Sequence, residues 1–296
     1  MLVTMKELLD KASAGNYAVA APNVSNELNA RACIEAAEDM KAPLILDVAY
    51  MAAVDIQFLG EQLRRLAEQS SVEIAINLDH GASLEQVMAA IRAGFTSVMI
   101  DRSACPDEEN IRDVSEIVRI AHAVGVSVEA ELGHVGDAMH YEEDRDAALT
   151  DPQFAMEYIK KTGVDCLAVA VGTAHGAYPK GFVPYLDFDR LAEIKKATNH
   201  FPLVLHGSSG TAHEDLRKAC SMGINKVNIN TDLCVASQKV ALEAAQPDKP
   251  SFLLLHAIQD GIRDELKKMI EIYGSQGKCE PDPTKGLPRT RIRRAE

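Results

Sequence analysis

The segment EIAINLDHGASLEQVMAAIRAGFTSVMID, residues 73–101, contains one complete unit of the pattern that decides the fold. It begins with a short β-rich run, continues with a helical pattern that starts at Ser83 and stops at Gly94, and ends with a second β-rich run. Two strands joined by such a crossover run parallel, because the crossover returns the chain to start the next strand in the same direction. The unit therefore predicts a parallel sheet.

The same unit repeats on both sides of this segment. Eight β-rich runs can be counted, at residues 16–24, 43–49, 73–80, 97–101, 127–133, 166–172, 202–207 and 226–232. Regular alternation with helical patterns predicts a closed (β/α)8 TIM barrel, with an N-terminal helix at 1–15 and a C-terminal helical extension at 249–273. A doubly wound open sheet is the alternative, but no Gly-x-Gly-x-x-Gly follows the first run.

Composition limits the partners. The chain has 296 residues, of which 47% are hydrophobic and 25% charged, so it can bury a large core. We expect one domain at 1–275 and a Pro- and Arg-rich tail at 276–296, for which disorder is the default and a subunit-spanning arm is the alternative. A formal charge of −13 argues against binding to nucleic acid or anionic membranes. We expect a cytoplasmic protein. The six cysteines form no Cys-x-x-Cys pair, and the sequence shows neither a signal peptide nor an apolar membrane span.

Three histidines share one sequence context. His80, His175 and His206 each end an apolar run, and each is followed by glycine. In a parallel barrel the carboxyl ends of the strands meet at one mouth, where reactive groups gather. Imidazoles placed there can converge on one metal ion, while the glycines allow close approach of backbone and ligand. The three residues are therefore our candidate metal ligands.

Five motifs in order resemble the class II, metal-dependent ketose-bisphosphate aldolases, which include fructose- and tagatose-bisphosphate aldolases. The resemblance spans roughly residues 1–275. It is carried by LDHG (78–81), VEAELG (128–133), GTAHG (172–176), LHGSSG (205–210) and KVNINT (226–231). Each motif is moderately specific, and the ordered set is strongly specific.

The resemblance implies a lyase that reversibly cleaves a phosphorylated ketose to dihydroxyacetone phosphate and an aldehyde through a zinc-stabilised enediolate. His80, His175 and His206 would bind Zn²⁺ or another divalent ion, which agrees with the preference of zinc for three imidazoles and an open position. Asp101 and Glu131 match positions that hold a second metal or brace the first. A monovalent cation and assembly into a homodimer or homotetramer are also family expectations.

The remaining site residues are carried over position by position. Asp79 would be the acid/base at the hydroxyl made from the aldehyde oxygen, with a carboxylate that merely orients an imidazole as the alternative role. Asn228 and Asn23 would contact the substrate. The phosphate would lie on backbone amides and hydroxyls of the glycine-rich turns, supplied by Gly176, Gly207, Ser208, Ser209, Asn230 and Thr231.

Several departures from the family pattern bear on the substrate. The usual mobile-loop Gly-Gly-x-Glu is Gly-Asp-Ala-Met at 136–139, so we expect Glu142 or Glu143 to substitute, or the proton to travel through water. Asn77 replaces a histidine, and Ala49 replaces a serine. A Tyr-x-Arg that holds a distal phosphate in relatives aligns with Leu-Leu-His at 254–256.

Loss of that arginine leads us to expect an acceptor aldehyde other than glyceraldehyde 3-phosphate, because guanidinium pairing is the strong way to hold a phosphate. A true fructose or tagatose 1,6-bisphosphate aldolase is the second reading, in which Arg263 or the terminal arginines reach the site from a neighbouring subunit. A metal-dependent hydrolase and a non-catalytic sugar-phosphate binding protein are the alternatives from other classes.

Overall fold

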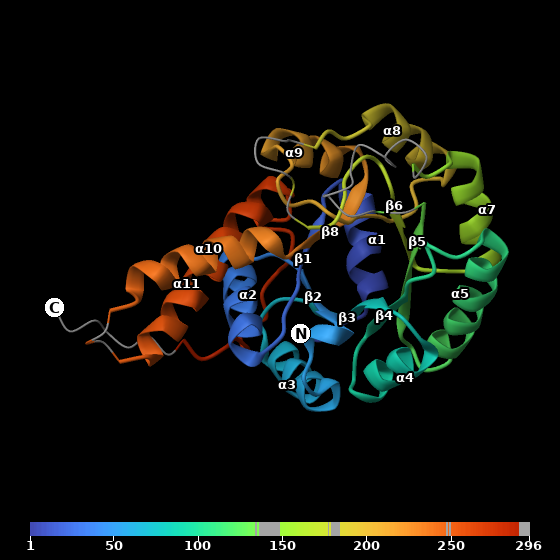
Figure 1. Ribbon diagram of the computed structural model, residues 1–296. Coiled ribbons are helices and arrows are strands. Elements are labelled where there is room, and N and C mark those ends of the chain that lie inside the picture. Colours follow the sequence, from blue (N-terminus) through green and yellow to red (C-terminus); the bar gives the residue numbers. More distant parts are fainter. Residues whose placement is uncertain are drawn as a thin grey trace.

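Eight parallel strands close into a barrel in the part of the chain that the computed structural model describes (Figure 1). The described residues are 1–133, 135, 149–176, 178, 184–246, 248 and 250–289. The strands are β1 (Val19–Pro22), β2 (Leu44–Ala49), β3 (Ile74–Gly81), β4 (Ser97–Ile100), β5 (Ser127–Leu132), β6 (Cys166–Val169), β7 (Leu203–Leu205) and β8 (Ile224–Ile229). The predicted TIM barrel is confirmed.

Helices surround the barrel and connect the strands (Figure 1). They are α1 (Met5–Gly15), α2 (Glu27–Met40), α3 (Ile56–Gln69), α4 (Leu84–Arg92), α5 (Asp107–His122), α7 (Pro152–Thr162), α8 (Phe188–Ala197), α9 (His213–Met222), α10 (Thr231–Ala244) and α11 (Phe252–Ile272). A 3₁₀ turn, η1, covers Tyr50–Ala52. Ser83, Asp151 and Asp187 each accept a hydrogen bond from a backbone N–H three residues on, which fixes where α4, α7 and α8 begin.

Alternation along the strands separates two environments. On β3, Ile74, Ile76 and Leu78 face outward and pack in the large core between strands and helices. Residues at the intervening positions, such as Asn77 and Asp79, therefore face the barrel interior. The same period of two applies to the other strands, so polar residues in apolar runs mark the inside of the barrel.

Helix α1 closes the amino-terminal end of the barrel. Its buried side chains, Met5, Leu8 and Leu9 among them, form one cluster with interior residues of the strands such as Ile45 and Val204. Burying one such side chain stabilises the fold by about 1.5–3 kcal/mol. This end is sealed by apolar packing, and the polar interior positions lie toward the opposite end.

Two expectations about the carboxyl-terminal third need correction. Thr231 and Asp232 begin α10 and are not strand residues, because β8 ends at Ile229 and Asn230 leads directly into the helix. The tail is also ordered from residue 276 to Arg289, where disorder was expected. The backbone N–H of Gly286 donates to Gln69 at 2.9 Å, and Leu287 is buried against the barrel.

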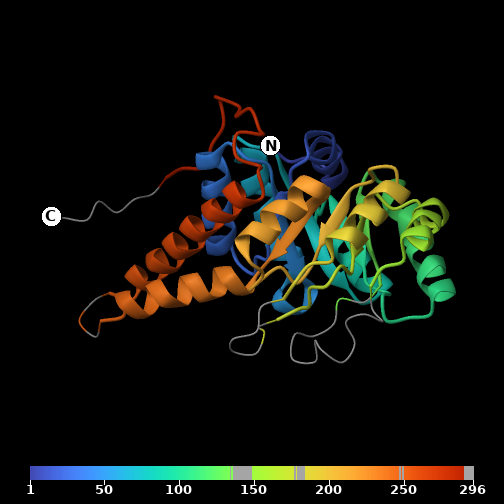
Figure 2. The same ribbon diagram turned by 90° about the horizontal axis from the view of Figure 1, so that it is seen from above.

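Helices α10 and α11 lie side by side and project beyond the barrel (Figures 1 and 2). Gly261 lies where α11 packs against α10. A Cβ at this position would lie 2.8 Å from the Cα of Ser237, so the contact requires glycine. Among the described residues, no helix is both long enough and apolar enough to cross a bilayer.

Candidate metal centre

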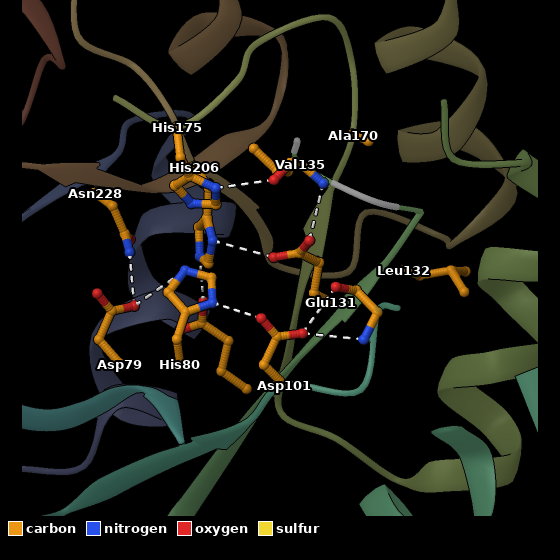
Figure 3. A network of polar contacts seen from close by, with 12 residues as sticks. Asp79, His80, Asp101, Glu131, Leu132, Val135, Ala170, His175, His206 and Asn228 are labelled. Carbon is orange, nitrogen blue, oxygen red and sulfur yellow. Dashed lines mark hydrogen bonds and ion pairs between the residues drawn. The ribbon is translucent and has the colours of Figure 1, made fainter. Parts of the chain in front are cut away.

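The three candidate histidines meet at the carboxyl-terminal mouth of the barrel (Figure 3). His80 comes from β3, His206 follows β7, and His175 lies in the loop after β6. The ring centroid of His80 is 4.9 Å from that of His175 and 4.8 Å from that of His206. One ring nitrogen of each residue lies within 4.8 Å of the others. The sequence prediction that these side chains converge agrees with this geometry.

Each ring has one nitrogen held by a neighbour. The Nδ1–H of His80 donates to Asp101 at 2.7 Å, and that of His175 donates to the carbonyl of Val135 at 2.9 Å. The Nε2–H of His206 donates to Glu129 at 2.9 Å. These contacts fix the orientation of each ring, as the partners of metal-bound histidines usually do.

The other nitrogens are left to face one another. Nδ1 of His206 is buried and accepts or donates no hydrogen bond among the described residues, although Glu131 Oε2 lies 3.3 Å away. With Nε2 of His80 and Nε2 of His175 it forms a three-nitrogen set that suits a tetrahedral ion with one open position. The donor set therefore fits a divalent metal ion such as zinc.

The backbone at His80 explains how two consecutive residues reach the site. In a regular strand Asp79 and His80 would point to opposite faces. His80 instead has φ 48°, and the pairing of β3 with β4 shifts register between Leu78 and Gly81. A left-handed backbone at a non-glycine residue is strained, and such strain concentrates at functional sites. Here it turns both side chains toward the same network (Figure 3).

A group of charged side chains fills the barrel below the histidines. Lys226 Nζ lies 2.7 Å from Glu129 and 3.2 Å from Asp47, and all three are fully buried. The amide of Asn77 donates to Asp47 at 2.9 Å. We call Asp47, Asn77, Glu129 and Lys226 the charged layer. Because buried charges are costly unless paired, its role is to keep Glu129 ionised beneath His206.

The electrostatic environment differs among the three histidines. Burial alone would lower the pKa of His206, but Glu129 and Glu131 on either side raise it to about 10. The pKa of His80 is raised as well, because Asp101 and Asp79 outweigh burial. Burial and the two neighbouring imidazoles lower the pKa of His175. The carboxylates thus favour positive charge at the place where the ring nitrogens meet.

Asp79 lies beside the histidines and is held on both oxygens. Asn228 donates to Oδ1 at 3.1 Å, and Asn23 donates to Oδ2 at 2.8 Å. The distance from Asp79 Oδ1 to His80 Nε2 is 3.8 Å. Burial would raise the pKa of Asp79, but the charges of His80 and Lys226 lower it. The carboxylate is ionised at neutral pH and can accept a proton from a hydroxyl group.

Asp101 and Glu131 brace the cluster. Besides its contact with His80, Asp101 accepts hydrogen bonds from the backbone N–H and the hydroxyl of Ser103 at 3.0 and 2.8 Å. Glu131 Oε1 accepts the backbone N–H of Val135 at 3.0 Å. His80, Asp101 and Glu131 also form a second group whose ligand atoms could share an ion.

The expected phosphate residues follow the carboxyl ends of three strands, β6, β7 and β8. Gly207 has φ 64°, and a Cβ at this position would lie 2.3 Å from the carbonyl oxygen of Ala174, so only glycine fits where the segment after β7 passes the segment after β6. The hydroxyl of Ser208 donates to the carbonyl of Asn228 at 2.6 Å, which ties the β7 turn to β8. Asn230 directly precedes α10, Thr231 is the first residue of that helix, and Ser209 precedes α9. Gly176 follows His175 with φ 94°.

Two predicted site residues lie outside the described part of the chain, and four residues near the histidines were not predicted as part of the site. Glu142 and Glu143 lie outside the described residues. Sequence reasoning did not assign Asp47, Asn77 and Lys226 to the site, and it did not recognise Glu129 as the partner of His206. The available signal was a charged or amide residue at an interior position in the middle of an apolar strand.

The family model described as fructose-bisphosphate aldolase class-II matches residues 3–278. A fructose-bisphosphate aldolase from Thermus caldophilus is 39% identical over 309 residues, covering 94% of this chain and 100% of that protein. One from Geobacillus stearothermophilus is 42% identical, covering 94% of this chain and 99% of that protein.

A solved structure has the same architecture. The YdjI aldolase from Escherichia coli K12 superposes with a TM-score of 0.85 at 34% sequence identity. The match covers 95% of this chain and 100% of that one. The similarity extends over the barrel and the helices around it, and is not limited to the site.

Proposed function

This chain belongs to the class II fructose-bisphosphate aldolase family, and on that premise we propose that His80, His175 and His206 form its catalytic metal centre. The chain is a metal-dependent lyase that cleaves an aldol, as its family membership indicates. The observation that carries the proposal is the convergence of three ring nitrogens, each on an imidazole whose other nitrogen is already engaged.

Zn²⁺ is the ion that we propose for these residues, because three imidazole nitrogens at an open tetrahedral site are typical zinc ligands. A bound divalent ion supplies Lewis acidity, which polarises a carbonyl group. Asp101 and Glu129 would hold two of the ligating rings in place, while Glu131 adds negative charge beside His206.

Asp79 is the residue that we propose to move the proton. In the cleavage direction, its carboxylate takes the proton from the ketose hydroxyl that becomes the aldehyde oxygen. In the reverse direction it returns the proton. Asn23 and Asn228 keep both carboxylate oxygens oriented, and their N–H donors favour the ionised form that cleavage requires.

The donor phosphate would lie at the turns around Gly207 and Asn230. Both turns lead into helices, α9 and α10, whose first backbone N–H groups have no partner within the helix. Such N–H groups bind phosphate without requiring a lysine or arginine. This arrangement suits a chain with a formal charge of −13.

For the acceptor, we propose an aldehyde other than glyceraldehyde 3-phosphate. Arg263 is one of the arginines that could restore a phosphate contact, and its guanidinium is committed to carboxylates. It lies 2.7 Å from Asp260, 3.2 Å from Asp264 and 3.7 Å from Glu35. The terminal arginines after Arg289 lie outside the described residues. The names of the relatives favour the second candidate, fructose 1,6-bisphosphate.

A retro-aldol screen tests both candidates. Ketose 1-phosphates with and without a second terminal phosphate are offered to the purified protein, dihydroxyacetone phosphate is detected by a coupled assay, and bound metal is measured alongside. We expect cleavage of a singly phosphorylated ketose by zinc-loaded protein. Efficient cleavage of fructose 1,6-bisphosphate, unmatched by any monophosphate, would establish the second candidate instead.

We also propose that the chain forms a homodimer or homotetramer through the projecting pair α10 and α11. Leu242, Phe252 and Leu255 on these helices are exposed apolar side chains, between 46% and 70% accessible. Analytical ultracentrifugation of the wild type and of Leu242→Asp tests this. We expect the variant to have the smaller mass, and a monomeric wild type would contradict the proposal.

A further inference from the structure

A cavity of about 210 Å³ lies beside the metal centre, at the carboxyl ends of β1 and β2 and against the start of α10. Asn23 lines this cavity and also donates to Asp79, so the cavity begins where the acid/base carboxylate is held. Asn230, which follows β8, lines the same space. The cavity therefore extends from the proposed site of proton transfer toward α10.

The described side chains that line the cavity carry no formal charge. Asn29 and Ser237 offer neutral polar groups, Cys33 and Cys234 offer thiols, and Leu233 and Ile262 are aliphatic. Arg263 is adjacent in sequence to Ile262, but its guanidinium is paired with three carboxylates. Within the part of the chain that the structure describes, the lining includes no cation that could pair with a phosphate.

The helix ends near the cavity do not supply the missing positive charge. Helices α2 and α10 both begin close to it, and a helix N-terminus attracts anions. However, the N-terminus of α2 is capped by the side chain of Asn26, and Glu27 lies in its first turn. The first backbone N–H groups of α10 would already hold the donor phosphate. The carboxylate of Glu27 and that phosphate would both repel a second anion at this place.

We propose that this cavity is an aldehyde pocket, which holds the carbon chain of the acceptor beyond its carbonyl group and selects uncharged, short hydroxyaldehydes over phosphorylated ones. The inference rests on the proposed function, because it requires Asp79 to exchange a proton with the aldehyde oxygen. At about 30 Å³ per water, the volume equals roughly seven waters, enough for a few hydroxylated carbons. A phosphate there would lose hydration without gaining a cationic partner from the described lining residues.

The test introduces a cation into the pocket. Cys234→Arg places a guanidinium on the exposed wall formed by α10, and Val235→Arg places the same group on the next residue, which lines a different groove between α10 and α11. Aldol addition of dihydroxyacetone phosphate is measured with D-glyceraldehyde and with D-glyceraldehyde 3-phosphate. The readout is the ratio of the two kcat/KM values.

We expect the wild type and Val235→Arg to prefer the unphosphorylated aldehyde to the same degree. Cys234→Arg should shift the ratio by about ten-fold or more toward the phosphorylated aldehyde, because a guanidinium–phosphate pair is a strong, charge-assisted contact. A wild type that prefers the phosphorylated aldehyde, or a folded Cys234→Arg variant with an unchanged ratio, would overturn the pocket. If Cys234→Arg does not fold, Ala52→Arg on the opposite wall takes its place.

A second readout separates this inference from the proposed function. Exchange of the α-hydrogen of dihydroxyacetone phosphate with solvent deuterium requires no aldehyde, so it reports only the donor half of the site. We expect similar exchange in the wild type and both arginine variants. Exchange without a shift in the aldehyde ratio refutes the pocket alone, whereas a metal-loaded wild type without exchange refutes the proposed function.

Discussion

Asp79, the proposed acid/base, is a side chain whose position and charge are both fixed by its neighbours. Two asparagine amides hold its oxygens, and its burial is offset by the neighbouring charges of His80 and Lys226. A carboxylate that only oriented an imidazole would not need an amide donor on each of its oxygens. The geometry favours a direct role in proton transfer, and it makes the residue a test of catalysis against mere binding.

Asp79→Ala should abolish most turnover without releasing the metal. Loss of a general acid/base lowers kcat by about 10²–10⁴-fold. Steady-state kinetics and metal analysis of the same preparation check this. If activity survives at near wild-type levels, Asp79 is not the acid/base. If the variant loses the metal, Asp79 contributes to metal binding instead.

Glu129 would support the proposed metal centre through its contact with His206. Glu129→Gln keeps the shape but removes the charge that faces both His206 and Lys226. Changing such a partner of a metal ligand lowers metal affinity by about 10–100-fold. Competition with a chelating dye measures this affinity, and Glu193→Gln on the exposed face of α8 is the matched control. Equal affinity in both variants would show that the charged layer only stabilises the fold.

Sequence reasoning was strongest for residues in a repeated context. His80, His175 and His206 could be predicted because the same strand end followed by glycine occurred three times. Asp47 and Lys226 could not, because a buried ion pair between β2 and β8 depends on barrel closure, which no local pattern contains. The left-handed backbone of His80 is likewise a property of the pairing of β3 with β4.

At the scale of elements, the strands arrange the interior in levels. Apolar side chains pack on α1 at one end, the charged layer follows, and the histidines and Asp79 lie at the other end. The strand positions were largely predictable from β-rich runs. The end of β8 was not, because the polar run Asn-Ile-Asn-Thr fits either a strand end or a helix start.

Lys195 joins three elements at the amino-terminal side of the barrel. It donates to Asn225 and to the carbonyl of Phe201, both at 2.8 Å, and to Ser13 at 3.2 Å. Burial lowers its pKa from 10.5 to about 8. Between these two pH values the unfolded chain binds more protons at this residue than the folded protein. Burying the charged Lys195 side chain therefore destabilises the folded protein fully below pH 8. This destabilisation decreases as the pH rises from 8 to 10.5.

The expected result is a pH-dependent difference between the wild type and Lys195→Met. As pH increases from 7.5 to 10, the free energy of unfolding of the wild type should rise relative to that of the variant. Urea denaturation at each pH measures both. A difference that stays constant over this range would mean that Lys195 keeps its ordinary pKa in the folded protein.

At the scale of the whole molecule, the tail holds the outer helices of the barrel. Arg289 lies 2.8 Å from Asp39 and 3.3 Å from Glu38 on α2, and Asp282 donates its backbone N–H to Ser71 at 2.8 Å. The default of disorder rested on the Pro, Gly and Arg content of this segment. It failed because the carboxylates of α2 supply partners that composition does not reveal.

Removal of residues 280–296 should therefore lower stability and spare the chemistry. Each lost kcal/mol lowers the Tm of a domain of this size by about 2–4 °C. Calorimetry should show a lower Tm, while the kcat of the metal-loaded protein at 25 °C stays close to that of the full chain. A truncated protein with unchanged Tm would contradict the packing role of the tail.

The central claim is that one divalent ion at the three histidines is required for carbon–carbon cleavage. The direct measurement is a titration of chelator-stripped protein with Zn²⁺, in which bound zinc and retro-aldol rate are followed together. We predict no cleavage by the stripped protein and a rate that rises in proportion to bound zinc up to one ion per chain. Full activity after verified removal of all metal would contradict the account.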